Sequence, residues 1–246
     1  MEKKDEIRKF GTGGFLTLKE LGEKEFLEEI FPEKKDNRFI HAEHIYNRIW
    51  GKEGKLKREC AYKSSIDLRL GREVFLSTKK EPINIEKDDT AVTINPGEFA
   101  LLQTLEKIYI PVYLMAFISV RYSYKKKGLI NVSGFHVDPG YEGYITFSVY
   151  NAGPSSVVLR YGDSVFTIFF ATLTQSVDVA RRDVPEVLIK GYTNRIPSSD
   201  IEEIKGPPIS LPQLDERLTK VESNLKWLIA ILIAFFGAAL AAIFAK

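Results

Sequence analysis

The stretch GFHVDPGYEGYITFSVYN, residues 134–151, carries the strongest fold signal in the chain. Asp138 stands before a Pro-Gly pair, Tyr141 follows the pair, and apolar and polar residues then alternate as far as Asn151. Pro-Gly pairs favour tight turns, and alternation with a period of two favours a strand with one buried face. The stretch therefore predicts a turn that leads into a half-buried β-strand.

Strands of the same kind surround this stretch. Period-two segments occur at SIDLRL, AVTI, EFALLQTL, YITFSVY, SVVLRY and SVFTIFF. Turn residues separate them at Pro96-Gly97, Pro139-Gly140, Gly153-Pro154 and Gly162-Asp163. Many short strands at this spacing favour a β-sandwich or β-barrel over a parallel α/β sheet. We therefore expect a mainly β domain over residues 59–196.

The composition is that of a globular protein. Of the 246 residues, 44% are hydrophobic and 28% are charged, and 35 basic against 33 acidic residues leave a net charge of +2. So small a charge predicts no large field that would attract nucleic acid. The single cysteine, Cys60, excludes an intrachain disulfide and suits a reducing compartment. Residues 1–14 lack the apolar stretch of a signal peptide.

The segment before the β domain, residues 1–58, has a helical pattern. In TLKELGEKEFLEEIF (17–31), Thr17 is a candidate N-cap and Glu20 follows at the spacing of a capping box. A second short helix is expected at HAEHIYNRIW (41–50). His41 and His44 have the i, i+3 spacing of a metal-binding pair, but no third ligand stands nearby in the sequence.

The end of the chain predicts a coiled coil that continues into a membrane helix. After an expected linker at 197–210, apolar residues follow 3-4-3-4 spacing at Leu211, Leu214, Leu218, Val221, Leu225, Leu228 and Leu232. We expect a coiled coil over residues 211–226 and a transmembrane helix over 227–245. The stretch WLIAILIAFFGAALAAIF (227–244) has no charge, and at about 1.5 Å per residue it approaches the roughly 30 Å core of a bilayer. A buried core helix is the alternative.

Small residues and flanking charges extend this prediction. Alanine recurs every four residues from Ala230 to Ala242, which lets membrane helices approach closely, although a lone lipid-facing anchor could show the same pattern. Three basic residues between 217 and 226 precede the span, whereas only Lys246 follows it. The positive-inside tendency then predicts a single-pass C-terminal anchor with the β domain in the cytoplasm.

Several stretches, taken in order, resemble the dCTP deaminase branch of the dUTPase superfamily. They are SSIDLRLG (64–71), PGEFALLQTLEKIYIP (96–111), VRYSYKKKGL (120–129) and GFHVDPGYEGYITFSVYNAG (134–153). A further stretch, LRYGDSVFTIFF (159–170), resembles the closing strand motif. The resemblance implies a dUTPase-like jelly roll or β-barrel that assembles as a homotrimer, with active sites shared between neighbouring subunits.

The resemblance also implies a phosphate site. Arg121, Ser123 and Lys126 match the motif that contacts phosphate, and Tyr122 replaces a family serine. Arginine can hold phosphate oxygens with two hydrogen bonds, serine can donate one, and lysine adds a point charge, although a solvated lysine run is the alternative. Asp67 matches an aspartate that reaches Mg²⁺ through water, the ion expected with the nucleotide, and a structural carboxylate is its alternative role.

The hairpin at 134–151 matches the positions that contact base and sugar. Asp138 matches the aspartate that activates the attacking water in dUTPases. Tyr141 takes the place of the aromatic residue against the deoxyribose, and Asn131 resembles the asparagine on the uracil edge. In the deaminases a glutamate ten residues after the aspartate moves the protons, and that position here is Ser148. Thr167 stands where dUTPases have a phosphate-binding glutamine.

These residues favour binding over deamination. A serine hydroxyl without a partner is too weak an acid and base to deaminate cytosine. We therefore predict a membrane-anchored trimer that binds deoxynucleoside triphosphate as a sensor or scaffold. One alternative is an active membrane-tethered dUTP diphosphatase or dCTP deaminase. Another is a structural trimer that organises a membrane assembly without nucleotide. The expected partners are further copies of the chain, a deoxynucleoside triphosphate and the lipid bilayer, but not nucleic acid.

Overall fold

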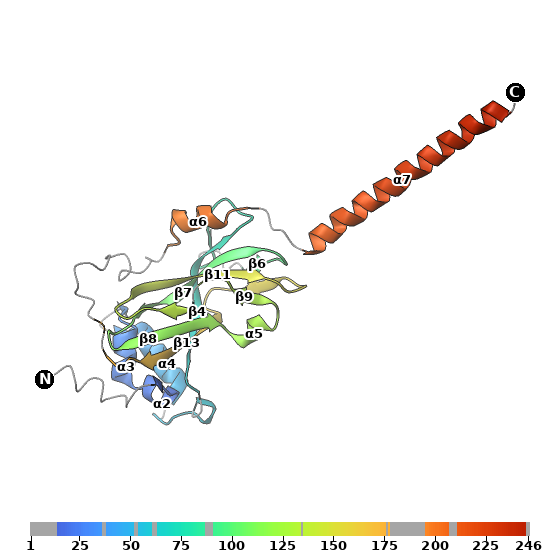
Figure 1. Cartoon of the computed structure of the whole chain (residues 1–246). Helices are drawn as coiled ribbons and strands as arrows, with labels where there is room; N and C mark the ends of the chain where they lie inside the picture. The colour runs from blue at the N-terminus through green and yellow to red at the C-terminus, as the bar shows by residue number, and fades with distance from the viewer. Residues whose placement is uncertain are drawn as a thin grey trace. The chain divides into compact units, whose positions relative to one another are not determined.

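The computed structural model describes residues 14–35, 38–51, 54–60, 63–86, 91–133, 135–175, 177, 195–206 and 211–244. The chain forms two units, Met1–Pro207 and Pro208–Lys246, which are described separately. Figure 1 shows strands and short helices in the first unit and one long helix in the second.

Antiparallel strands dominate the first unit, which confirms the mainly β prediction. The main sheet is built from β1 (Gly14–Phe15), β4 (Ile66–Leu76), β5 (Ile83–Asn84), β7 (Phe99–Tyr109), β8 (Leu114–Val120), β9 (Leu129–Asn131), β10 (His136–Val137), β11 (Glu142–Asn151) and β13 (Ser164–Thr172). Its order is β10-β8-β13-β4-β7-β11-β9, with β1 paired to β13 and β5 paired to β4. Two smaller pairs are β12 (Val157–Leu159) with β6 (Val92–Ile94), and β2 (Lys34–Lys35) with β3 (Arg38–Phe39).

Burial along the strands follows the alternation in the sequence. Every second side chain of β11 is buried, as the period-two pattern predicts. The six predicted segments all form strands, namely β4, β6, β7, β11, β12 and β13. β8 adds a strand that the pattern does not predict. Its less buried positions include Met115 and Phe117, so both faces of this strand are largely apolar and the alternation is hidden.

A bend in β4 curls the sheet. The first part of β4 pairs with β13, and the part from Leu70 onward pairs with β7. The register with β7 shifts between Leu70 and Val74. At Gly71 an added Cβ would lie 2.7 Å from the carbonyl oxygen of Thr104, so only glycine lets the two backbones approach this closely. β4 can therefore pair with β13 through its first part and with β7 through its second part.

The N-terminal helices pack into the same hydrophobic core as the strands. They are α2 (Leu18–Leu21), α3 (Lys24–Ile30), α4 (Ile40–Trp50) and the 3₁₀ turn η1 (Arg58–Cys60). The Thr17 cap is confirmed, because Oε2 of Glu20 accepts the backbone N–H of Thr17 at 2.7 Å. The single helix predicted at 17–31 is instead two helices, since the first one ends at Gly22.

A polar network joins these helices to the sheet. The carboxylate of Glu106, which is fully buried, accepts the backbone N–H of Arg69 at 2.9 Å and its Nε at 2.7 Å. Nη2 of Arg69 lies 3.0 Å from Nδ1 of His41, and Nε2 of His41 lies 3.0 Å from Oε2 of Glu33. Arginine can only donate, so His41 accepts at Nδ1 and carries its proton on Nε2. The nitrogens of His41 are therefore used within the fold rather than in a metal pair with His44.

The segment expected to be a linker contains a helix, α6 (Ser198–Ile204). Ile201 and Ile204 pack against a small cluster of Phe75, Leu101 and Ile196. Isoleucine at i, i+3 spacing places both side chains on one face of the helix. The compact unit therefore extends beyond residue 196, the boundary expected from composition.

The second unit contains one long helix, α7 (Leu211–Phe244). Within it, Leu214–Ala238 is long and apolar enough to cross a membrane, judged by length and composition. This stretch begins before Trp227, the predicted start of the span. The seam residues described on α7, among them Leu218 and Leu225, are exposed in the single chain. The predicted coiled coil would cover them, and it stays a prediction.

A glycine pair next to the short helix α5 (Tyr122–Lys125) gives a test of the packing. Gly128 has a φ of +100°, and an added Cβ would lie 2.2 Å from the backbone of Gly153. We expect Gly128→Ala to lower the free energy of unfolding by roughly 3 kcal/mol, since it combines backbone strain with an overlap.

The matched control is Gly162→Ala, where φ is +78° but no atom lies within 4 Å of the added Cβ. Its cost should be about 1 kcal/mol, from backbone strain alone. Thermal unfolding of the full chain in detergent, followed by Trp50 fluorescence in a Trp227→Phe background, compares the two. Equal losses would contradict the close approach at Gly153.

Candidate functional site

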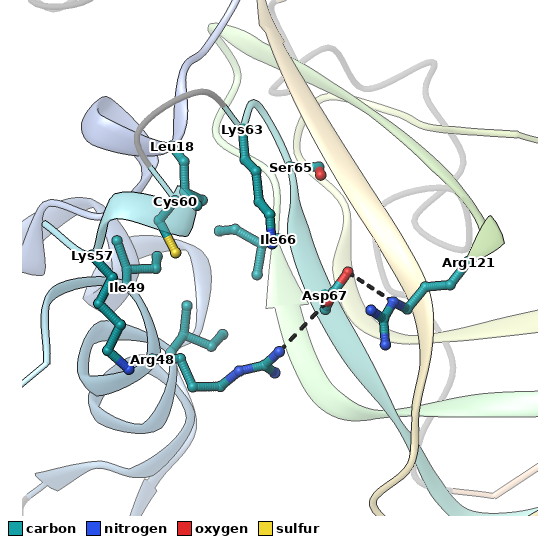
Figure 2. Close-up of a pocket in the computed structure, with 11 residues that line it drawn as sticks. Leu18, Arg48, Ile49, Lys57, Cys60, Lys63, Ser65, Ile66, Asp67 and Arg121 are labelled. Carbon is teal, nitrogen blue, oxygen red and sulfur yellow. Dashed lines mark ion pairs between the residues drawn. The ribbon is translucent and has the colours of Figure 1, made fainter. Parts of the chain in front are cut away.

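Two arginines hold the carboxylate of Asp67 (Figure 2). Nε of Arg121 lies 3.3 Å from Oδ1 of Asp67, and Nη2 of Arg48 lies 3.5 Å from Oδ2. Each carboxylate oxygen therefore faces a different guanidinium. The sequence placed Asp67 and Arg121 in two separate motifs, and the fold brings them together.

The sheet explains how these side chains meet. Strand β13 lies between β4, which carries Asp67, and β8, which ends just before Arg121. The backbone N–H of Arg121 donates to the carbonyl oxygen of Val165 at 2.8 Å, and Nη1 donates to that of Ser164 at 3.1 Å. Thr167 stands level with Asp67 on the neighbouring strand. The arginine is thus fixed by backbone contacts as well as by the carboxylate.

A cavity of about 420 Å³ opens beside this ion pair. One turn of α4 contributes Ile45, Arg48 and Ile49 to its wall, and Leu18, Ser65 and Ile66 contribute further contacts. Lys57, Cys60 and Lys63 complete the set, from the segment around η1 and the entry to β4. In the described ranges its charged lining consists of Arg48, Lys57, Lys63 and Arg121 against the single carboxylate of Asp67.

The positive charge extends to the neighbouring part of α4. The pKa of His44 is lowered from its usual value, first by desolvation and then by the charges of Arg69 and Arg48. Desolvation and neighbouring cations both disfavour the protonated imidazole. Both causes favour a neutral imidazole at His44.

The other residues of the predicted phosphate motif lie on and just after α5. Ser123 and Lys126 are exposed there, as is Tyr122, and none of the three is among the residues that line the cavity. Of the predicted phosphate contacts, the cavity wall contains only Arg121. Ser123 and Lys126 are available to a ligand at the surface next to it.

The predicted base and sugar residues lie on the hairpin between β10 and β11. Gly140 has a φ of +84° and donates its N–H to the carbonyl oxygen of Ile110 at 2.7 Å, which shapes the turn. Asp138 is exposed, and its Oδ1 lies 3.7 Å from Nε2 of His136. The hydroxyl of Tyr141 donates to the carbonyl oxygen of Tyr144 at 2.7 Å, so its ring is held against the hairpin.

Ser148 lies in the middle of β11, opposite Leu101 of β7. Its carbonyl oxygen accepts the N–H of Val132 at 2.8 Å, and its N–H donates to Oγ of Ser133 at 3.2 Å. That hydroxyl in turn lies 3.3 Å from Oδ1 of Asn131. Ser133 therefore links the side chain of Asn131 to the backbone N–H of Ser148.

The glutamates at the start of β11 and just before β7 have other partners. The carboxylate of Glu142, at the start of β11, pairs with Nζ of Lys107 at 2.5 Å. The carboxylate of Glu98, which is buried near the start of β7, accepts the hydroxyl of Thr78 and the backbone N–H of Asn95. Within the described part of the chain, neither glutamate is recorded as a partner of Ser148.

Within one chain, the predicted phosphate residue Arg121 lies far from the predicted catalytic residue Asp138. Val137 pairs with Ala116 on β8, so Asp138 stands level with Met115, whereas Arg121 follows the far end of β8. At about 3.3 Å per residue, six residues separate these levels by roughly 20 Å along the strand. Arg121 and Asp138 of the same chain would therefore not act on one phosphate.

The residues around Asp67 fit an anion better than Mg²⁺. Magnesium prefers oxygen ligands, and both oxygens of Asp67 face guanidinium groups. Among the described residues, no group of three or more histidine, cysteine, aspartate or glutamate side chains could hold a metal ion. This geometry favours the structural alternative for Asp67.

The sequence did not point to Arg48, Lys57 or Lys63. They lie in HIYNRIWGKEGKLKRECAYK (44–63), where acidic residues are interspersed among the basic ones. Such a mixture is typical of a solvated surface. Only the spacing of Ile45, Arg48 and Ile49 on one helical face gives a hint, because an arginine flanked by two apolar residues would face the core.

Comparison with known proteins places this chain in a family context. The family of dCTP deaminase-like domains matches residues 37–173. A dCTP deaminase of Pyrococcus furiosus is 39% identical over 115 residues, which cover 47% of this chain and 71% of the relative. A "dCTP deaminase, dUMP-forming" of Hydrogenobaculum is 35% identical over 120 residues, which cover 46% of this chain and 68% of the relative.

Solved structures show weaker similarity. The 2'-deoxycytidine 5'-triphosphate deaminase of Agrobacterium tumefaciens aligns with a TM-score of 0.45 and 13% identity, over 65% of this chain and 49% of that one. The dUTPase of Streptococcus mutans aligns with a TM-score of 0.36 and 25% identity, over 50% of this chain and 87% of that one.

Proposed function

This chain belongs to the dCTP deaminase-like family, and we propose that it binds a deoxynucleoside triphosphate at a membrane as a sensor or scaffold without deaminating it. The observation that carries the proposal is Ser148. By the sequence resemblance it takes the position of the proton-transferring glutamate, and its backbone carbonyl and N–H bond to Val132 and Ser133. Deamination needs a group that takes a proton from water and gives one to the leaving amine. A serine hydroxyl without an acidic or basic partner does not supply it.

Binding of the triphosphate is supported by the charges around Arg121. Its guanidinium is held by Asp67 and by the carbonyl oxygen of Ser164, which lowers the entropy lost when it binds a ligand. Ser123 and Lys126 offer a hydroxyl and a cation beside it. These groups match the chemistry of phosphate oxygens, which accept charge-assisted hydrogen bonds.

We expect Arg121→Ala to weaken triphosphate binding by about 2–3 kcal/mol, because it removes a charge-assisted contact. Titration calorimetry of the full chain in detergent, with dCTP and with dUTP, measures the change. The matched control is Arg160→Ala, which removes an exposed arginine of the β12–β13 turn and should leave the affinity unchanged. If the unmodified chain binds neither nucleotide, the scaffold without nucleotide becomes the better reading.

Restoring the acid tests the role assigned to Ser148. We expect no ammonia release from dCTP by the unmodified chain, and any deamination to require Ser148→Glu. The exposed Tyr122, in place of a family serine, is a second obstacle that Tyr122→Ser removes in a double variant. Ammonia measured from dCTP with Ser148 still in place would defeat the proposal.

Assembly as a homotrimer is part of the proposal. Completing a site from Arg121 and Asp138 needs a second chain, because one chain keeps them far apart. An aromatic patch formed by Phe15, Phe117 and Phe135 supports self-association. Phe15 is 62% exposed and Phe135 64% exposed, and both rings lie within about 6 Å of the ring of Phe117. Exposed apolar groups of this kind mark interaction surfaces.

The membrane part of the proposal rests on α7. Three chains joined through their β domains would raise the local concentration of their tails to roughly millimolar, which offsets the shortness of the coiled coil. The helices would then form a parallel bundle on the trimer axis, with the β domains in the cytoplasm. Single cysteines at Leu218 and Leu225, in a Cys60→Ser background, should crosslink in membranes to trimer-sized products, and monomers throughout would contradict the bundle.

A membrane-tethered dUTP diphosphatase is the second candidate. Asp138 favours it, because its exposed carboxylate could orient a water molecule at a neighbouring subunit's phosphates. This activity would appear as dUMP formed from dUTP, and Asp138→Asn should then abolish it while nucleotide binding remains.

A further inference from the structure

We propose that the cavity beside Asp67 binds the phosphate chain of its ligand through arginine and lysine side chains without a divalent metal ion. Arg48, Lys57 and Lys63 are its additional anion-binding residues. The inference rests on the proposed nucleotide binding and specifies the phosphate chemistry of that site.

The charged side chains that line the cavity are mostly positive, which favours an anionic ligand. Among the residues that the structure describes, four cationic side chains line it, Arg48, Lys57, Lys63 and Arg121, against one carboxylate, Asp67. Figure 2 shows Arg48 and Arg121 approaching Asp67 from opposite sides, with Lys57 and Lys63 on either side of Cys60 in this view. A concave site lined by one sign of charge concentrates ligands of the other sign. A triphosphate is such a ligand, whereas a divalent cation would be repelled.

The two arginines have more hydrogen-bond donors than their contacts within the protein use. A guanidinium has five N–H donors and no acceptor. Arg121 uses Nε toward Asp67 and Nη1 toward Ser164, and Arg48 uses Nη2 toward Asp67. Within the described part of the chain their remaining donors have no further acceptor, so they are left for a ligand, and the carboxylate keeps both guanidinium groups in place. Asp67 therefore acts as a positioning residue for the arginines rather than as a metal ligand.

The phosphate chain could belong to a nucleotide or to inorganic polyphosphate, and the two can be compared directly. The shared chemistry is a run of linked phosphate groups, which a nucleotide and inorganic polyphosphate both present. The test therefore uses dCTP, dUTP and inorganic tripolyphosphate, each titrated into the full chain in detergent, once with EDTA and once with Mg²⁺.

The lysines provide the first variant. Lys57→Gln/Lys63→Gln should weaken the binding of tripolyphosphate and of the nucleotides by about tenfold in EDTA, since each lost cation removes a charge-assisted contact. The matched control is Lys79→Gln/Lys80→Gln, which removes the same charge from the exposed turn after β4 and should change nothing. If the first variant binds as tightly as the second, the lysines are not ligands and the proposal is overturned.

A variant of Asp67 should change ligand affinity in opposite directions, depending on whether the cavity binds phosphate directly or holds Mg²⁺ through Asp67. Asp67→Asn removes the one carboxylate among the described residues of the cavity, while the amide oxygen of asparagine can still accept a hydrogen bond from a guanidinium and hold it in place, so anion binding in EDTA should become severalfold tighter. If Asp67 instead held Mg²⁺ through water, the same change would weaken nucleotide binding in Mg²⁺, and EDTA would abolish binding by the unmodified chain. Either of these results would overturn the proposal.

The titrations with tripolyphosphate and with nucleotides can fail independently, so they distinguish the metal-free phosphate site from the proposed nucleotide binding. Tripolyphosphate binding that depends on Lys57 and Lys63, together with no nucleotide binding, would support the cavity and end the nucleotide proposal. Nucleotide binding that depends on Arg121 and on Mg²⁺, but not on the lysines, would leave the nucleotide proposal standing and end the metal-free cavity.

Discussion

The double variant Ile231→Arg/Phe235→Arg is expected to move the full chain from the membrane fraction to the soluble fraction. Both residues lie in the apolar stretch of α7 and are exposed in the single chain. A charge near the bilayer centre costs about 2.5–3.5 kcal/mol, so two together should shift the distribution by roughly a thousandfold or more. Flotation of vesicles after expression measures the distribution.

The matched control places the same two charges earlier on the same helix. Ser223→Arg/Asn224→Arg adds them before Trp227, in the part of Leu214–Ala238 that already carries Arg217, Lys220 and Lys226 and is therefore expected to face water and lipid headgroups. This variant should stay with the membrane. If both variants float with the vesicles, α7 is not the anchor. If neither variant floats with the vesicles, the added charges act through folding or assembly.

Glu106→Ala is expected to destabilise the β domain by about 3–5 kcal/mol. The carboxylate of Glu106 is buried and accepts two hydrogen bonds from Arg69, whose side chain is only 19% exposed. Removing one partner of such a pair leaves the other as an uncompensated charge. Because Arg69 also contacts His41 on α4, the N-terminal helices should lose protection in hydrogen exchange together with β4.

Glu86→Ala is the matched control for this loss. Glu86 pairs with Arg72 at 3.5 Å, but both side chains are well exposed, and pairs of this kind contribute at most about 1 kcal/mol. Thermal unfolding in the Trp227→Phe background compares the two variants. Equal shifts in Tm would mean that the network of Arg69 and Glu106 does not tie the helices to the sheet.

Much of the fold could be predicted because its signals are local. The alternation in β11, the turn before Tyr141 and the cap at Thr17 each depend on residues close in the sequence, and each appears in the structure. β8 could not be found this way, because Phe117 and Met115 make its second face apolar as well. That face carries Phe117 of the aromatic patch.

The site could be predicted only in part. The motifs identified Asp67 and Arg121 separately, and their contact depends on β13 lying between β4 and β8. The three cations that complete the cavity come from a segment of mixed charge, where the sequence gives no reason to prefer one basic residue over another. Sheet order and helix packing are long-range properties, and they decide which of these cations face the cavity.

The central claim is that this family member binds a deoxynucleoside triphosphate and does not deaminate it. A single-turnover experiment tests it most directly, with the full chain in excess over labelled dCTP and with bound nucleotide and free ammonia measured in the same sample. The account predicts that dCTP is retained by the protein and recovered unchanged, with no ammonia, and that Arg121→Ala loses the retention. Ammonia released in proportion to the bound dCTP, with Ser148 in place, would contradict it.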